Sequence, residues 1–240
     1  MKKLVLATAL LIAGFVNAQG PSYDDLRILY ADGNYEKLVK SSESYTQKDK
    51  SKTDALPFMW LARGLYKISQ SGAADEKYKN AYKEAVGALG KAIKLDKSGD
   101  VQREYSEFFQ EFKMSLVEII GNDLSVPDYK KANSWVLKYY KLAPTSLGAK
   151  LLEGACKFRN ADKGGANAAW KDADKKIAAL ADIDGWDPAD VALFKMGVIQ
   201  TADCYVASRQ VDKAKTLLGK VAQYFEEDEE FKAKYDEIVN

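Results

Sequence analysis

The chain of 240 residues contains no histidine, only two cysteines and only five prolines. Without histidine, neither the serine–histidine–aspartate nor the cysteine–histidine arrangement of hydrolases can be built, and the paired-histidine zinc motif is also excluded. Scarce proline, together with plentiful alanine, lysine, leucine and glutamate, favours helix throughout the chain. The composition therefore predicts an all-α protein with few routes to catalysis, and no metal or cofactor is expected.

Long apolar runs are also absent after Val16. Before that point, Lys2 and Lys3 precede an apolar stretch from Leu4 to Val16, and small residues follow it up to Ala18. This pattern predicts a secretory signal peptide over residues 1–18, because the stretch is shorter than the ~20 residues that span a bilayer. We therefore expect cleavage after Ala18 and a soluble periplasmic or extracellular protein that does not span the membrane.

The sequence also has nearly equal numbers of basic and acidic residues, 36 and 35. Loss of residues 1–18 would remove two lysines and no acid, which leaves 34 basic residues against 35 acidic ones. Binding to phosphate backbones needs a clustered positive surface. The balanced composition thus argues against nucleic acid as a partner.

A short pattern with a small or apolar anchor residue recurs five times along the chain. Its copies are Tyr35-Glu-Lys-Leu38, Tyr82-Lys-Glu-Ala85, Tyr129-Lys-Lys-Ala132, Trp170-Lys-Asp-Ala173 and Val211-Asp-Lys-Ala214. The anchors are spaced 47, 47, 41 and 41 residues apart. Each copy opens an amphipathic helical pattern and is preceded by another one, so the spacing predicts stacked pairs of helices.

The pattern predicts one domain over residues 19–240 made of five helical hairpins and a final helix. We place the hairpins at about 22–46, 56–97, 100–144, 146–182 and 188–225, with a capping helix over 229–239. Asp228 precedes that helix as a candidate N-cap, and Phe231, Tyr235 and Ile238 follow at helical spacing.

The third copy resembles the tetratricopeptide repeat family. In the family pattern an aromatic residue is followed three residues later by the alanine anchor. An apolar residue stands seven residues after the anchor, and a proline closes the unit. Here these residues are Tyr129, Ala132, Tyr139 and Pro144. The resemblance implies a right-handed α-solenoid whose first helices line a concave face. Other helical-hairpin solenoids with units of 40 residues or more remain an alternative.

For such a solenoid we expect a non-catalytic scaffold or adaptor of the cell envelope that binds a protein or peptide on its concave face. The candidate contact residues lie on predicted first helices; they are Trp60, Arg63, Lys67, Phe158 and Arg159. Aromatic and arginine side chains dominate binding energy where they are exposed, but Trp60 and Phe158 could equally belong to the core.

Three further alternatives stay open at this point. The chain could instead carry a small molecule or a glycan, or a pair of carboxylates could cleave cell-wall glycan. Cys156 and Cys204 occupy near-equivalent positions of two first helices, and an oxidising compartment permits a disulfide between them. Packed helices lie ~8–10 Å apart, which favours two buried free thiols instead.

Overall fold

The computed structural model describes residues 22–72 and 76–240, so the predicted signal peptide lies outside the described residues. Within them the chain is all-helical and contains no strand. The first six α-helices are α1 Asp24–Ala31, α2 Tyr35–Gln47, α3 Ala55–Gln70, α4 Ala81–Leu95, α5 Asp100–Glu104 and α6 Ser106–Ser125. The next six are α7 Tyr129–Tyr139, α8 Leu147–Arg159, α9 Lys163–Ala178, α10 Pro188–Ala207, α11 Val211–Val221 and α12 Glu229–Val239. Short 3-10 turns lie at Glu76–Tyr78 and Ala222–Tyr224.

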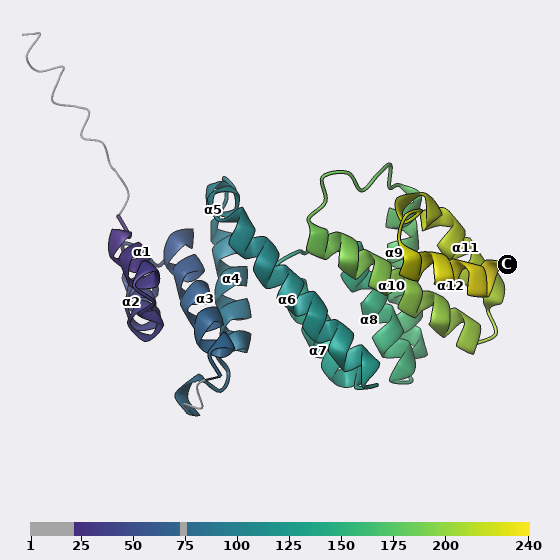
Figure 1. Ribbon diagram of the computed structural model, residues 1–240, viewed down its shortest axis with the longest axis horizontal. Coiled ribbons are helices and arrows are strands. Elements are labelled where there is room, and N and C mark those ends of the chain that lie inside the picture. The colour runs from purple at the N-terminus through teal and green to yellow at the C-terminus, as the bar shows by residue number, and fades with distance from the viewer. Residues whose placement is uncertain (1–21, 73–75) are drawn as a thin grey trace, which may run out of the picture.

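Helices that follow one another in the sequence pack as pairs: α1 with α2, α3 with α4, α6 with α7, α8 with α9, and α10 with α11. We call the earlier member of each pair a first helix and the later member a second helix. The pairs succeed one another along the long axis of the molecule, and α12 lies at the far end against α10 and α11 (Figure 1). Among the described residues, no helix is both long enough and apolar enough to cross a membrane.

The observed helices follow the predicted ranges to within one residue, since α2 ends at Gln47 and α3 begins at Ala55, and one helix start differs more. The fourth copy of the pattern predicts a helix that begins near Trp170, whereas α9 already begins at Lys163. Asp162 explains the early start, since its carboxylate accepts a hydrogen bond from the backbone N–H of Gly165 at 2.8 Å and caps the helix. Asp228 caps α12 in the same way through the N–H of Phe231, as predicted.

The core runs along the molecule as two adjoining clusters that share α8 and α10. On α8, Ala149, Leu152 and Cys156 belong to the cluster on the N-terminal side, whereas Leu147 and Leu151 belong to the C-terminal one. Residues three or four apart lie on the same face of a helix, so α8 presents a separate apolar stripe to each side. This helix therefore joins the two halves of the core.

Two glycines allow α8 and α10 to pack closely. A Cβ atom placed on Gly148 would lie 2.3 Å from the carbonyl carbon of Leu193 and 2.4 Å from the backbone nitrogen of Phe194. On the other helix, a Cβ on Gly197 would lie 2.8 Å from the carbonyl oxygen of Gly148. Both contacts are with backbone, so no side-chain rearrangement can make room for a larger residue at Gly148.

A partly buried ionic cluster connects α6 and α7 to the start of α10. The Lys113 ammonium lies 2.9 Å from a carboxylate oxygen of Asp187 and 2.5 Å from one of Asp190. The hydroxyl of Tyr139 donates a hydrogen bond to Asp190 at 2.9 Å. Asp187 also caps α10 by accepting from the N–H of Ala189. This cluster fixes how the third pair of helices meets the fifth.

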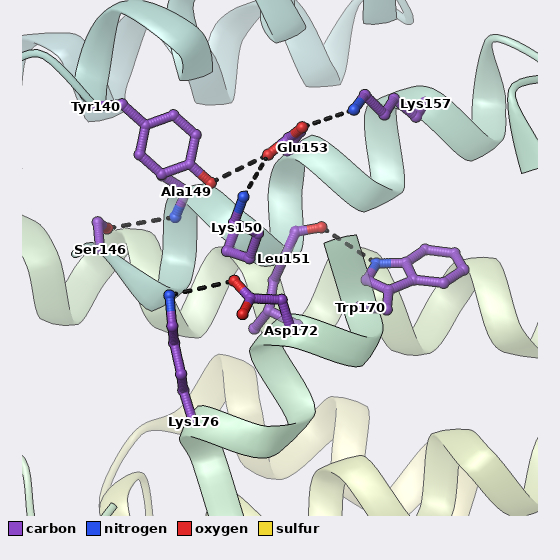
Figure 2. Close-up of polar contacts among 10 residues, drawn as sticks. All are labelled: Tyr140, Ser146, Ala149, Lys150, Leu151, Glu153, Lys157, Trp170, Asp172 and Lys176. Carbon is purple, nitrogen blue, oxygen red and sulfur yellow. Dashed lines mark hydrogen bonds and ion pairs between the residues drawn. The ribbon is translucent and has the colours of Figure 1, made fainter. Parts of the chain in front are cut away.

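A second ionic cluster lies where α7 meets α8 (Figure 2). Glu153 accepts hydrogen bonds from Lys157 at 2.6 Å, from Lys150 at 3.0 Å and from the hydroxyl of Tyr140 at 3.3 Å. Burial by itself would raise the pKa of Glu153, but the hydrogen bonds from the two lysines outweigh it and lower the pKa below its usual value. The folded state therefore favours the ionised carboxylate.

We expect Glu153→Gln to lower the free energy of unfolding by about 1–2 kcal/mol at pH 7, because it weakens charge-assisted hydrogen bonds of a side chain that is only 12% exposed. A carboxylate with a lowered folded pKa stabilises the fold above its unfolded pKa of about 4.3, and this contribution is lost as the pH falls. Urea unfolding across pH should therefore show the deficit shrinking below about pH 4. Glu84→Gln, at an exposed position of α4, is the control and should change little at any pH.

Candidate functional site

The five residues that the sequence selects as partner contacts do not form one site. Trp60 is only 3% exposed and lies in the N-terminal core cluster, so it is not an exposed anchor. Phe158 packs against the C-terminal cluster, with its ring centroid 5.7 Å from that of Trp170. The structure therefore divides the set between two separate parts of the core.

The three cationic residues of that set already have partners within the chain. The Arg63 guanidinium lies 4.0 Å from the ring centroid of Tyr30 and 4.9 Å from that of Trp60. Lys67 lies 3.5 Å from a carboxylate oxygen of Glu111 on α6. Arg159 donates a hydrogen bond to the hydroxyl of Tyr129 at 2.7 Å and another to the Cys204 sulfur at 3.5 Å. These contacts hold neighbouring helices together.

Cys156 and Cys204 are free, buried thiols in the structure, and no disulfide joins them. Burial raises the pKa of the Cys156 thiol to about 12, and burial also raises that of Cys204. Nucleophilic and redox chemistry proceeds through the thiolate, which neither residue supplies at neutral pH. The two cysteines act as small core residues.

A groove with a volume of about 500 Å³ lies between two second helices. Its walls come from α9, from α11 and from the residue just before α11, and its floor from α8, α9, α10 and α11. We call it the α9–α11 groove. The wall residues are Asn167, Lys171, Asp174, Gln210, Lys213, Thr216 and Lys220, and the floor residues are Leu151, Trp170, Ile177, Thr201, Tyr205 and Leu217.

The floor of the α9–α11 groove is largely apolar, and the polar groups of Trp170 and Thr201 in it are hydrogen-bonded to backbone. The ring centroids of Trp170 and Tyr205 are 4.8 Å apart. The indole N–H of Trp170 and the hydroxyl of Thr201 both donate to the carbonyl oxygen of Leu151, at 3.2 and 3.3 Å. Trp170 is 3% exposed, whereas Tyr205 is half-buried and reaches the groove surface. Tyr205 is therefore the aromatic residue that a guest can touch.

The rim of the α9–α11 groove is polar and carries more positive than negative charge. Lys220 pairs with Asp174 across the groove at 2.6 Å. Lys213 donates to the side-chain oxygen of Gln210 at 2.6 Å. Lys171 is exposed and has no ion-pair partner within the described residues. Three lysines against one carboxylate leave a surplus of two positive charges for a guest.

The lining offers binding groups and no recognisable reaction chemistry. Thr201 is fully buried and hydrogen-bonded to backbone. Two carboxylates do converge elsewhere, at Asp187 and Asp190, but both are engaged by Lys113. Within residues 22–72 and 76–240, no three histidine, cysteine, aspartate or glutamate side chains are grouped to hold a metal ion.

Sequence reasoning missed the groove because it searched the first helices. The signal was present on the second helices, where Lys213 and Lys220 lie seven residues apart on one face of α11. Comparison with known proteins does not assign the site, since the chain matches no protein-family model and no curated protein.

Proposed function

We propose that this protein is a non-catalytic scaffold that holds a segment of another polypeptide in the α9–α11 groove. The observation that carries the proposal is the groove itself. Residues of α9 from Asn167 to Ile177 line it, as do residues from the N-cap Gln210 to Lys220 of α11, over about 15 Å each from the 1.5 Å helical rise per residue. An apolar floor beneath a polar rim is the usual composition of a protein–protein interface.

The packing of the helices supports a solenoid similar to tetratricopeptide repeats as the architecture of this scaffold. Helices contact one another within each pair and also between neighbouring pairs, as α2 does with α3 and α8 with α10, which is the arrangement of repeat proteins. A repeat architecture provides surface for a guest and positions few catalytic groups. With secretion predicted from residues 1–18, we place the scaffold in the periplasm or outside the cell.

The groove is a better candidate than the face of first helices selected from the sequence. There, Trp60 is buried and Arg63, Lys67 and Arg159 hold their own helices together. A guest at that face would have to displace these contacts before gaining any of its own. In the groove, a guest can reach Lys171 and Tyr205 without first displacing contacts between helices.

Filling the groove with Thr216→Trp tests the proposal. Thr216 is exposed on α11 and lines the groove, so an indole there should occupy the guest's space while leaving the helix intact. We expect the capture of polypeptides from the envelope fraction by chemical crosslinking to fall at least about tenfold, with an unchanged melting temperature. Ser44→Trp, at an exposed position of α2, is the matched control and should bind like the unmodified chain. Equal capture by both variants would exclude the groove.

A carrier of a small molecule or glycan is the second candidate, since the groove volume of about 500 Å³ lies within the range of about 300–1,000 Å³ for small-molecule sites. Asn167, Gln210 and Asp174 supply the amide and carboxylate groups that sugar hydroxyls bind. Calorimetric titration with cell-wall oligosaccharides distinguishes the two. Saturable binding that Thr216→Trp abolishes would favour the carrier, whereas no heat of binding would favour the polypeptide scaffold.

A further inference from the structure

The second helices from α4 onward carry far more positive than negative charge. Helix α4 has three lysines and one acidic residue, and α7 has three lysines and no acidic residue. Helix α9 has four lysines and two acidic residues, and α11 has three lysines and one acidic residue. The thirteen lysines are Lys83, Lys91, Lys94, Lys130, Lys131, Lys138, Lys163, Lys171, Lys175, Lys176, Lys213, Lys215 and Lys220. The four acids are Glu84, Asp172, Asp174 and Asp212. We call the surface made by these four helices the lysine face.

The balancing negative charge lies on other helices. On α6, four acidic residues stand against Lys113, and on α12 four stand against two lysines. The run Glu226 to Glu230 adds further acids just before and into α12. The near-zero net charge of the chain therefore hides a strong separation of charge between helices. Balanced net charge thus does not by itself exclude a clustered positive surface.

Most of the lysine face is available to a partner. Twelve of the thirteen lysines are exposed, Lys138 being the half-buried one. Within the described residues only Lys131, Lys176 and Lys220 form ion pairs with carboxylates. Unpaired like charges repel one another, and an anionic partner would relieve that repulsion.

Contacts between second helices join this face in two parts, α4 with α7 and α9 with α11. The rings of Tyr82 on α4 and Trp135 on α7 lie 5.7 Å apart. Burial and the nearby charges of Lys83 and Lys141 lower the pKa of Lys138, which places positive charges of α4 and α7 close together. At the other end, Lys220 and Asp174 link α11 to α9 across the groove.

We infer that the guest of the α9–α11 groove is an acidic polypeptide segment, rich in aspartate and glutamate, that continues onto the lysine face. This inference rests on the proposed scaffold function and names the chemistry of its partner. The groove contributes an aromatic and apolar floor for one part of the segment, and the lysines contribute salt-sensitive attraction along the rest.

The chemistry of the face favours polypeptide over nucleic acid or membrane. All its cations are lysines, whereas arginine is the residue whose planar guanidinium donates two hydrogen bonds to one phosphate. The indoles of Trp135 and Trp170, at 8% and 3% exposure, cannot stack on bases. The large apolar residues exposed on these helices are Leu137 and Val211, too few to insert into a bilayer.

Fluorescence anisotropy with labelled deca-glutamate tests the inference. We expect saturable binding to the chain that weakens at least about tenfold between 50 and 300 mM salt, because screening shortens the reach of exposed charges. Lys171→Glu/Lys213→Glu should weaken binding at least about tenfold. Lys37→Glu/Lys40→Glu makes the same charge change on α2, a helix with balanced charge, and should change affinity less than about threefold. Lys171→Gln/Lys213→Gln provides a milder pair should the glutamate variant fold poorly.

Three results would overturn the inference. The first is equal binding of deca-glutamate to the groove and α2 variants. The second is tighter binding to oligo-thymidine or to phosphatidylglycerol vesicles than to deca-glutamate, which would reassign the lysine face to another class of partner. The third is a salt-sensitive dimer of the chain alone by light scattering, which would make a second copy the occupant. If Thr216→Trp abolishes envelope capture while Lys171→Glu/Lys213→Glu does not, the scaffold function stands and the acidic partner is wrong.

Discussion

Replacing Lys113 with methionine should lower the free energy of unfolding by about 3–5 kcal/mol, the usual cost of removing one partner from a buried ion pair. Lys113 is only 8% exposed, and its ammonium is shared by Asp187 and Asp190. Methionine keeps much of the apolar stem but leaves two carboxylates facing each other without a cation. Urea unfolding followed by circular dichroism measures the loss.

The triple variant Lys113→Met/Asp187→Asn/Asp190→Asn separates electrostatics from packing. If the unpaired carboxylates cause the damage, neutralising them should restore a large part of the stability, and the effects should be strongly non-additive. Asp187 also caps α10, so the asparagine there is chosen because it is a good N-cap residue. Additive losses in the triple variant would contradict the assigned role of this cluster.

Replacing Gly148 with alanine should destabilise the fold by about 3 kcal/mol or more, at the upper end of what overpacking costs. The added methyl would meet the backbone of Leu193 and Phe194 at 2.3–2.4 Å, so α8 and α10 would have to separate. Because both helices contribute to both core clusters, the disturbance should reach the whole molecule. Thermal and urea unfolding give the size of the effect.

Gly87→Ala makes the identical chemical change with the opposite expected result. Gly87 lies inside α4, is exposed, and a Cβ there meets nothing within 4 Å. Alanine should therefore stabilise the protein by about 0.5–1 kcal/mol through its higher helix propensity. Similar stability of the Gly148→Ala variant and the unmodified chain would show that the close α8–α10 contact is not required.

The all-helical fold class was predictable because the spacing of apolar residues over a few turns is enough to indicate a helix. Apolar spacing and capping residues such as Asp228 placed most helix boundaries, and the anchor Ala132 is fully buried as the repeat pattern implies. The start of α9 was missed because the two glycines after Asp162 suggest a loop. The Asp162 carboxylate instead caps the first turn, so the helix includes both glycines. The contact between α6 and α10 was not foreseeable, since nothing local indicates that Lys113 meets residues 74 and 77 positions away.

The candidate site was harder to predict because exposure is a property of the packed molecule. Trp60 is a residue type that often anchors a binding partner, but on α3 its side chain is buried in the core. The lysines of α9 and α11 look like ordinary solvated residues one helix at a time. Only the packing of α9 beside α11 gathers them into the rim of one groove.

Hydrogen–deuterium exchange on the chain with and without saturating deca-glutamate tests the central claim most directly. If the groove holds an acidic segment, exchange should slow in α9, in α11 and in the turn at Gln210 that lines the groove, with no change in α1 or α3. Protection confined to α3 and α6, around Arg63 and Lys67, would place the partner on the face of first helices and contradict the groove assignment.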